Sequence, residues 1–150
     1  MQLKRFTDLG LRILMYLASR PKNASPVSVP ELAQALSWNP NLVVKAAHFM
    51  VKANWLTASR GRNGGLRLAK SPDEYQIGDI VRALEGDDPL VDCKQPTCPF
   101  SGRCVLAGAL REAEEAFWEK LNQFSLKELI AKPTANRTVI TPDPILRITP

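Results

Sequence analysis

The segment Ser28-Val-Pro-Glu-Leu-Ala-Gln-Ala-Leu-Ser-Trp-Asn-Pro-Asn41 carries the signals for two short helices separated by a tight turn. Ser28 followed by Glu31 has the spacing of a capping box, with a proline inside the first helical turn. After an interruption at residues 37–39, Asn39 can cap a second helix whose first residue is Pro40. Two helices joined by a three-residue turn predict a helix-turn-helix.

Downstream of this motif, the second helix is expected to continue to about residue 54 and to be followed by a β-hairpin. Its apolar face is predicted to consist of Val43, Val44, Ala47, Met50 and Val51. Residues 55–58 can form one strand and residues 66–68 the other, with the glycine-rich turn Arg-Gly-Arg-Asn-Gly-Gly between them. A helix-turn-helix followed by such a hairpin predicts a winged helix.

The charge of the chain is unevenly distributed. Residues 1–70 have a net charge of +9, residues 71–130 of −6, and the remaining tail of +2. A basic N-terminal half suits a polyanionic partner such as double-stranded DNA or RNA. The alternative that charge alone leaves open is a solvated surface without a partner.

Within the expected winged helix, polar side chains near the start of the second helix should face the major groove, and those of the wing should contact the backbone or minor groove. Asparagine can pair with adenine, and lysine offers charge to guanine or phosphate. For Asn39 we favour a purely structural role as a helix cap, and we expect His48 to be a surface or packing residue. The candidate DNA-binding residues are Asn39, Asn41, Lys45, Arg60, Arg62 and Asn63.

The rest of the chain is predicted to be mainly helical. Apolar spacing predicts a helix near the N-terminus, a short helix over residues 77–84, and a long helix after Cys104. The apolar stripe of the long helix can cover its own domain or pair with a second copy, and we favour dimerisation. The predicted fold is thus mainly α with a small β-hairpin: a winged helix-turn-helix domain (1–86), a cysteine loop (87–104), a dimerisation helix region (105–131) and a flexible tail (132–150).

All three cysteines of the chain lie in one short loop, at Cys93, Cys98 and Cys104. Because thiolates are soft ligands, such clustering favours an iron–sulfur cluster or zinc. Zinc sites usually have four ligands and tight cysteine pairs, which this loop lacks, and a cubane cluster would need one further ligand from elsewhere. The alternative is three free or redox-active thiols with no metal.

Several function classes find little support in the sequence. No apolar run of about 18 residues predicts a membrane span, and the polar N-terminus lacks a signal-peptide core. Unpaired cysteines without an export signal predict a cytoplasmic protein. With a single histidine and no Ser/His/Asp set, paired catalytic carboxylates or phosphate-binding glycine loop, we do not expect an enzyme.

Four stretches together resemble the family of winged-helix repressors that includes the nitric-oxide sensor NsrR and the iron–sulfur regulator IscR. They are residues 3–12 (LKRFTDLGLR), residues 56–69 (LTASRGRNGGLRLA), residues 77–86 (IGDIVRALEG) and the cysteine loop. The cysteine spacing is similar to that of the nitric-oxide sensors. The IscR-like members carry a histidine three residues after the last cysteine, where this chain has Ala107.

The resemblance implies a homodimeric repressor that binds operator DNA while it holds a 4Fe–4S cluster and releases it when nitric oxide attacks the cluster. Cys93, Cys98 and Cys104 would be ligands, and Asp8 of the partner subunit would be the fourth. Arg12, one helical turn from Asp8, would hold that carboxylate when it is not bound to iron. The resemblance makes a 2Fe–2S cluster the weaker alternative.

Two other functions remain open on sequence grounds. One is an iron- or redox-sensing regulator with the same cluster and a different signal. The other, from a different class, is a small iron–sulfur electron carrier, which would leave the winged helix and its basic charge without a role. A DNA-binding protein should lose affinity steeply as salt rises, whereas a carrier should show redox cycling without sequence-selective DNA binding.

Overall fold

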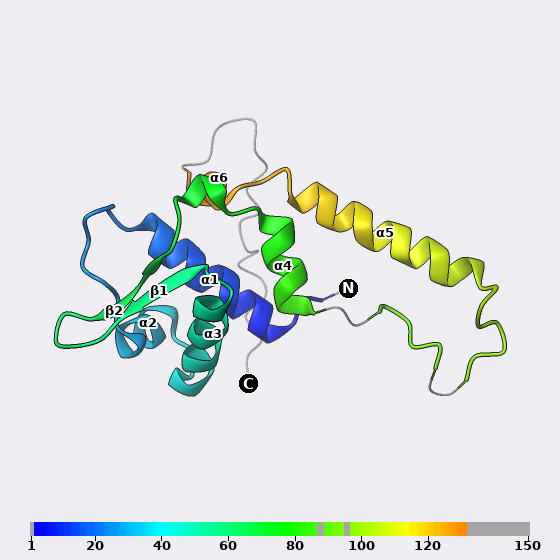
Figure 1. Ribbon diagram of the computed structural model, residues 1–150, viewed down its shortest axis with the longest axis horizontal. Coiled ribbons are helices and arrows are strands. Elements are labelled where there is room, and N and C mark those ends of the chain that lie inside the picture. The colour runs from blue at the N-terminus through cyan, green and yellow to red at the C-terminus, as the bar shows by residue number, and fades with distance from the viewer. Residues whose placement is uncertain (1, 87–88, 95–96, 132–150) are drawn as a thin grey trace, which may run out of the picture.

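The computed structural model describes residues 2–86, 89–94 and 97–131. The predicted tail, 132–150, lies outside the described residues. Figure 1 shows a body formed by the N-terminal elements and a long helix that leaves it. In chain order the elements are α1 (Arg5–Ser19), α2 (Val29–Leu36), α3 (Pro40–Lys52), β1 (Leu56–Ser59), β2 (Gly65–Leu68), the 3-10 helix η1 (Pro72–Glu74), α4 (Ile77–Glu85), α5 (Val105–Leu121) and α6 (Leu126–Ile130).

The helix-turn-helix forms as the capping signals predicted. The Ser28 side chain accepts a hydrogen bond from the Glu31 N–H (3.3 Å), and the Asn39 side chain accepts one from the Asn41 N–H (2.9 Å). Only half of the expected capping box forms, because the Glu31 carboxylate pairs with Arg20 instead, 3.2 Å away. The turn closes at Ser37, which adopts the left-handed conformation (φ 56°) that L-residues occupy at a cost of about 1–2 kcal/mol.

The hairpin that follows is antiparallel, with Leu56 opposite Leu68 and Ser59 opposite Gly65. Two glycines make its turn possible. Gly61 has a φ of +105°, which favours glycine, and a Cβ on Gly64 would lie 2.3 Å from the Ser59 carbonyl oxygen. Strand β2 gains a further antiparallel bridge on its other side, between Val27 and Leu66. The winged helix predicted from the sequence is therefore present.

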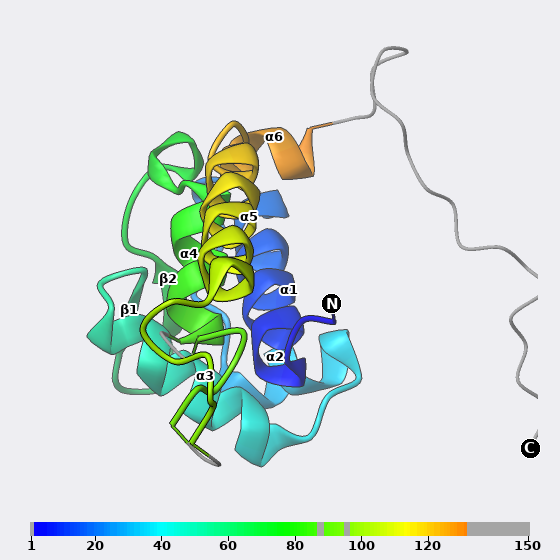
Figure 2. The same cartoon turned by 90° about the vertical axis from the view of Figure 1, so that its right-hand side faces the viewer.

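The hydrophobic core continues beyond the winged helix into the C-terminal elements. Leu126 of α6 is fully buried and Trp118 of α5 nearly so, and both belong to the same core as α1 and α4. The chain returns to the body by pairing Gln76 with Ser125. Figure 2 shows α5 in the foreground with α4 and α1 behind it, and α4 packs against both α5 and α1.

Two polar contacts fix α5 against α4. The Asn122 side chain accepts a hydrogen bond from the Asp79 N–H (2.9 Å) and donates one to the Asp79 carboxylate (2.7 Å). Arg82 makes a two-bond ion pair with Glu115 (3.0 and 3.1 Å). Because the two contacts lie on opposite sides of Trp118 in the sequence of α5, they hold the C-terminal half of α5 at a defined angle to α4.

The first two residues of α5 are open to solvent, whereas Ala107 and Leu110 in the following turn are partly covered. Val105 is 86% exposed and Leu106, the first residue of the apolar stripe predicted for the long helix, is 62% exposed. The stripe therefore covers its own domain only toward its C-terminal end, where Phe117 and Leu121 are packed against the core. Among the described residues, no helix is long and apolar enough to span a bilayer.

Candidate nucleic-acid interface and cysteine loop

One face of α3 is open to solvent. Four residues at helical spacing of three and four positions form it, and we call them the recognition face: Asn41, Val44, Lys45 and His48. The apolar residues on the opposite side of the helix are buried, with Val43 and Met50 at 0% exposure. The expectation that Val44 belongs to the apolar core face is wrong, because its side chain is 51% exposed. Helix periodicity allowed either placement, and the packing of α1 and α2 on the other side decided it.

The remaining predicted DNA-binding residues lie at two places. Asn39 uses its side-chain oxygen as the cap of α3, which matches the structural role considered for it. Arg60, Arg62 and Asn63 are all exposed at the tip of the wing, in the loop between β1 and β2. None of these residues has a positive φ, so the turn draws its unusual backbone conformation from glycine alone.

A buried tyrosine that the sequence analysis did not single out closes the base of the wing. The Tyr75 hydroxyl donates a hydrogen bond to the Trp55 carbonyl (2.7 Å) and accepts one from the Lys70 N–H (2.9 Å). Trp55 precedes β1 and Lys70 follows β2, so one hydroxyl joins the two ends of the hairpin. Burial raises the pKa of the Tyr75 hydroxyl above its ordinary value, and the backbone N–H groups of Lys70 and Ala69 partly offset this rise. No sequence pattern signals this contact, because its partners are backbone atoms.

Near the start of α1, the predicted pair of Asp8 and Arg12 is formed. Arg12 Nε donates to the Asp8 carboxylate at 2.8 Å, and the Asp8 side chain remains 45% exposed. The same end of α1 is joined to the root of the cysteine loop. The Lys4 N–H donates to the Glu85 carboxylate (2.9 Å), and the Lys4 ammonium donates to the Glu85 carbonyl, one residue before Gly86.

The first turn of α1 also contacts both ends of α3. The Arg5 guanidinium lies over the Trp38 ring, 5.6 Å from its centroid, in the turn that precedes α3. Phe6 packs edge to face on Phe49 of α3, and Phe49 does the same on Trp55, with ring centroids 5.8 Å apart in each pair. The residues next to Asp8 are therefore packed directly on α3 and on the turn that precedes it.

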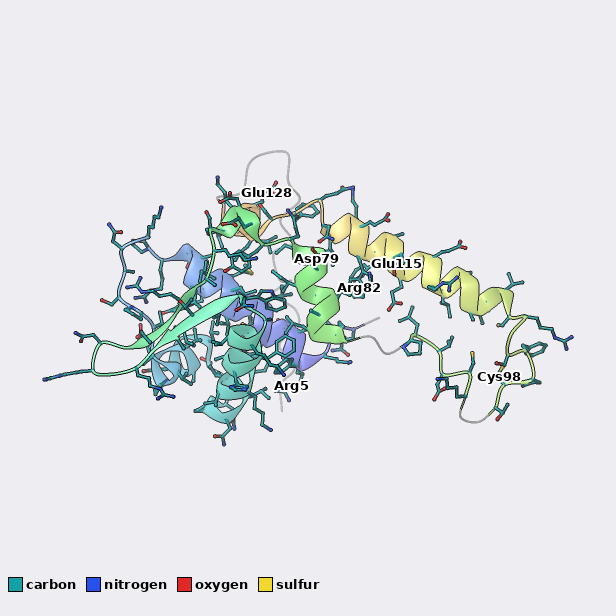
Figure 3. The ribbon with its side chains drawn as sticks, in the orientation of Figure 1. Arg5, Asp79, Arg82, Cys98, Glu115 and Glu128 are labelled. Carbon is teal, nitrogen blue, oxygen red and sulfur yellow. The ribbon has the colours of Figure 1, made fainter. Side chains whose placement is uncertain are left out.

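The three cysteines lie on the loop between α4 and α5, and each is partly exposed. Tight turns shape the loop: the Cys98 N–H donates to the Cys93 carbonyl (3.2 Å), and the Ser101 N–H donates to the Cys98 carbonyl (3.0 Å). Cys104 caps α5, its sulfur accepting a hydrogen bond from the Ala107 N–H at 3.4 Å. Figure 3 shows Cys98 in the outlying loop, far from Arg5.

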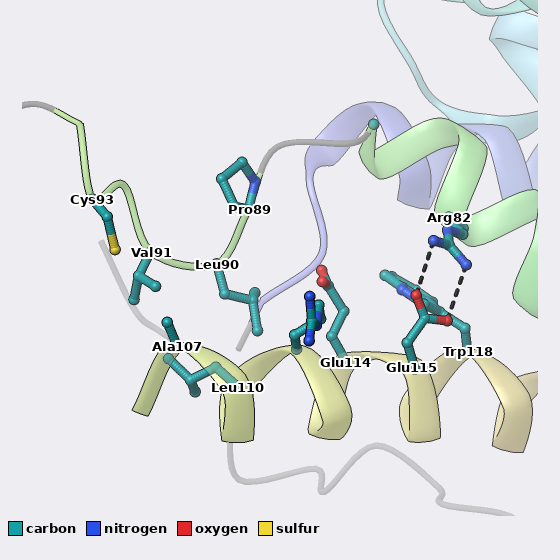
Figure 4. Close-up of a pocket in the computed structure, with 12 residues that line it drawn as sticks. Arg82, Pro89, Leu90, Val91, Cys93, Ala107, Leu110, Glu114, Glu115 and Trp118 are labelled. Atoms are coloured by element: carbon teal, nitrogen blue, oxygen red, sulfur yellow. Dashed lines mark hydrogen bonds and ion pairs between the residues drawn. The ribbon is translucent and has the colours of Figure 1, made fainter. Parts of the chain in front are cut away.

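Two of the cysteines border a common hollow of about 500 Å³. Cys93 and Cys104 line it together with Arg103 and Arg111, and Cys98 is not among its lining residues. Cys93 also ends a neighbouring groove of about 330 Å³, in which Leu90 and Val91 lie over α5 (Figure 4). Among the described residues, no group of three or more cysteine, histidine or acidic side chains is positioned to hold a metal ion.

The donor chemistry of the loop nevertheless suits an iron–sulfur cluster. Three accessible thiols on one loop are the ligand type that such clusters take. Arg103 and Arg111 at the shared hollow can offset the negative charge that thiolate ligands bring. The loop would need to draw Cys98 inward to complete a three-sulfur site.

The fold defines the chain as a winged-helix protein, and comparison with solved structures agrees. The structure is similar to that of CymR, the global cysteine regulator of B. subtilis (TM-score 0.70, 24% identity, 87% of this chain and 96% of that one). It is also similar to those of T. potens IscR (TM-score 0.69, 21% identity, 87% and 86%) and of the oxidized form of Staphylococcus aureus CymR (TM-score 0.70, 20% identity, 89% and 99%).

Sequence comparison narrows this class to a family. Residues 3–132 match the family model Rrf2, described as an iron-dependent transcriptional regulator. The HTH-type transcriptional regulator NsrR of Shouchella clausii (strain KSM-K16) is 38% identical over 133 residues, which cover 87% of this chain and 89% of that protein. The chain belongs to the Rrf2 family. It is a DNA-binding transcriptional regulator and a homologue of NsrR, not an enzyme, which confirms the resemblance seen in the sequence.

Proposed function

We propose that this regulator is a nitric-oxide-sensing repressor whose homodimer binds operator DNA when an iron–sulfur cluster is bound. The cluster would be of the 4Fe–4S type, held by Cys93, Cys98 and Cys104 and by Asp8 of the partner subunit. The observation that carries the proposal is the gathering of every cysteine of the chain into one exposed loop of an NsrR homologue. The full set of predicted DNA contacts (Asn39, Asn41, Lys45, Arg60, Arg62 and Asn63) belongs to this proposal.

An iron–sulfur cluster held by these residues would supply irons that can react with nitric oxide. The chain itself supplies the response. Asp8 is exposed, and its carboxylate lies 2.8 Å from Arg12 Nε. When the Asp8 carboxylate leaves the cysteine loop of the other subunit, it can therefore pair with Arg12 of its own chain. The link between the two subunits is lost, and each winged helix is freed to move against the other.

The packing around Asp8 explains how such a movement would reach the DNA. Arg5 and Phe6 contact the turn before α3 and the body of α3, so α1 and the recognition face move as one unit. Operator half-sites have a fixed spacing, and a small displacement between the two α3 helices weakens binding to both at once. A coupling of about 1–3 kcal/mol is enough to shift such an equilibrium.

The experiment that tests the proposal is an anaerobic titration with nitric oxide, in which visible absorbance and operator binding are followed together. The operator is first selected from a random duplex pool with the anaerobically purified protein. We expect bleaching of the cluster and DNA release to have the same stoichiometry. Holo-protein whose operator affinity is indifferent to nitric oxide would overturn the proposal.

The role of the wing is tested in the same assay. Arg60→Ala should weaken operator binding about tenfold and reduce the salt slope by about 1, because one phosphate contact is lost, while cluster absorbance stays unchanged. Lys127→Ala, at an exposed position on α6, is the matched control for the loss of one positive charge. Equal affinities for the two variants would exclude the wing from the interface.

Whether Asp8 acts across the dimer can be tested with mixed dimers. A dimer of one Asp8→Ala chain and one Cys98→Ala chain retains one complete site if Asp8 comes from the partner, and none if it comes from the same chain. We expect about half the wild-type cluster content, with wild-type stability toward iron loss. A mixed dimer that loses iron as fast as the Asp8→Ala homodimer would exclude ligation across the dimer.

A second candidate function is iron sensing with the same cluster, and the description of the family model as iron-dependent favours it. Under this alternative, operator binding would follow the iron supply of the cell. An iron chelator would then release the DNA, and nitric oxide would not be the signal. The titration above, repeated with an iron chelator in place of nitric oxide, separates the two signals.

A further inference from the structure

The recognition face contains one apolar residue among polar ones. Asn41, Lys45 and His48 surround Val44 on the exposed side of α3, while the other valine of the same turn, Val43, is fully buried. A half-exposed valine gains little from the core, since its side chain points away from it. Its neighbours on the helix surface are the side chains that the sequence predicts to meet DNA.

The position of Val44 along the helix matters as much as its exposure. α3 begins at Pro40, so Val44 lies just past the first turn, at the end of the helix that winged-helix proteins bring closest to the base edges. Figure 1 shows α3 next to the hairpin, with its N-terminal end at the lower edge of the body. The cysteine loop and the open end of α5 lie on the other side of the molecule, so Val44 does not belong to the exposed apolar surface around them.

The major groove contains one apolar group that a valine can contact. Of the four bases only thymine presents a methyl group there, and apolar side chains distinguish it from cytosine, which presents an amino group at the corresponding edge. Burying the valine methyls against a thymine methyl removes apolar surface of both partners from water. Contact with phosphate would instead favour a charged or polar side chain at this position.

We propose that Val44 is a specificity-determining residue that reads the C5 methyl group of a thymine in each operator half-site. The assignment rests on the docking of α3 in the major groove, as in the function proposed above. It adds a base-reading contact that carries no charge and forms no hydrogen bond. It therefore predicts a dependence on a single methyl group of the DNA.

The test removes that methyl group from either side of the contact. After operator selection with the holo-protein, each thymine of a half-site is replaced in turn by uracil, which pairs identically but lacks the methyl. At one position we expect a three- to fivefold loss of affinity, about the value of one buried methylene. The Val44→Ala variant should bind the thymine operator more weakly than wild type by a similar factor. It should bind the uracil operator no more weakly than the thymine operator, so the two losses are not additive.

Two further variants make the result specific. Lys45→Ala, on the same face, should bind more weakly overall but retain the full thymine-to-uracil effect. Val44→Thr keeps the shape of the side chain and exchanges one methyl for a hydroxyl, so it should fall between wild type and Val44→Ala. Because Val44 is exposed, and alanine is a better and threonine a comparable helix former, Val44→Ala and Val44→Thr should both leave the fold intact, as circular dichroism would verify.

The outcomes separate this inference from the proposed function. Operator-selective binding that is unaffected by uracil at every thymine, or a uracil effect that persists in Val44→Ala, would overturn the role of Val44 and leave the repressor assignment standing. Failure to select any operator with the holo-protein would instead overturn the docking mode on which both depend.

Discussion

The winged helix and the cysteine loop differ in how completely their own residues account for their structure. In the winged helix, the large apolar side chains of α1 and α3 that face inward are buried, and the side chains of Ser28 and Asn39 cap α2 and α3. In the loop and the start of α5, by contrast, Phe100, Val105 and Leu106 are 61–86% exposed, and three thiols are only partly covered. In the first region, the apolar side chains are covered by other residues of the same chain. The second has the surface of a site that something else completes.

The difference explains the division of labour proposed for the molecule. A DNA-reading surface must be rigid, because its side chains are held in register with base edges. A sensing loop must respond to its ligand, and such elements are drawn from the less stable parts of a structure. Five predictions test this contrast, beginning with the largest effect.

Removing one thiol should abolish the cluster and leave the winged helix intact. Cys98→Ala is expected to lose all of its iron and visible absorbance after anaerobic purification, because two remaining thiols cannot hold the cluster. Its helix content and denaturation midpoint should match those of apo wild type. Ser101→Ala, in the same loop, is the control and should retain full iron. A Cys98→Ala protein with full iron and sulfide would contradict the ligand assignment.

The same substitution made in the two regions should have very different costs. Leu126→Ala removes a fully buried side chain from α6 and should lower the free energy of unfolding by about 2–5 kcal/mol. Leu106→Ala, at a position 62% exposed, should change the stability of the monomer by no more than about 0.5 kcal/mol. Urea denaturation of both variants at low protein concentration measures the contrast, and similar costs would show that the start of α5 is covered in solution.

The base of the wing should be sensitive to the loss of one hydroxyl. Tyr75→Phe leaves the Trp55 carbonyl and the Lys70 N–H without this partner, at an expected cost of about 1–3 kcal/mol. Urea denaturation measures the cost. Tyr16→Phe, on the half-exposed side of α1, is the matched control and should be near neutral.

The raised pKa of Tyr75 also has a pH signature. Because burial favours the protonated form in the folded state, unfolding releases this proton above about pH 10. Stability contributed by the hydroxyl is present below that pH and falls as pH rises through the higher folded-state pKa. The alkaline decline should be steeper in wild type than in Tyr75→Phe, and equal slopes would argue against a role for Tyr75.

The smallest effect is expected at the turn between α2 and α3. Ser37 holds a left-handed conformation, so Ser37→Gly should relieve strain and raise stability by up to about 1 kcal/mol, part of the gain being lost to the greater freedom of the unfolded chain. Thermal denaturation would detect it as a small rise in midpoint. A fall in midpoint would show that the serine side chain makes a contact more valuable than the strain.

Local signals were enough to predict most of the secondary structure. The caps at Ser28 and Asn39 and the glycines of the hairpin turn place α2, α3 and the wing within a few residues of where they occur. They succeed because capping and turn formation involve atoms only two to six residues apart. The pair of Asp8 and Arg12 was predictable for the same reason.

Contacts between distant segments were not predictable in this way. The Tyr75 hydroxyl bonds to two backbone atoms, the Arg5 guanidinium lies over a ring 33 positions away, and Asn122 caps a helix formed 43 residues earlier. The exposure of Val44 was misjudged because a helix has more apolar positions than one face can bury. Only the packing of α1 and α2 shows which of two adjacent valines faces the core.

The sequence by itself determined the winged helix, the uneven charge and the gathering of all three cysteines in one loop, because each depends on residue type and short spacing. The tertiary structure decided which face of α3 is open, how α1 connects the region around Asp8 to that face, and how far the core extends along α5. These depend on burial, which is a property of surfaces that meet only when the chain has folded.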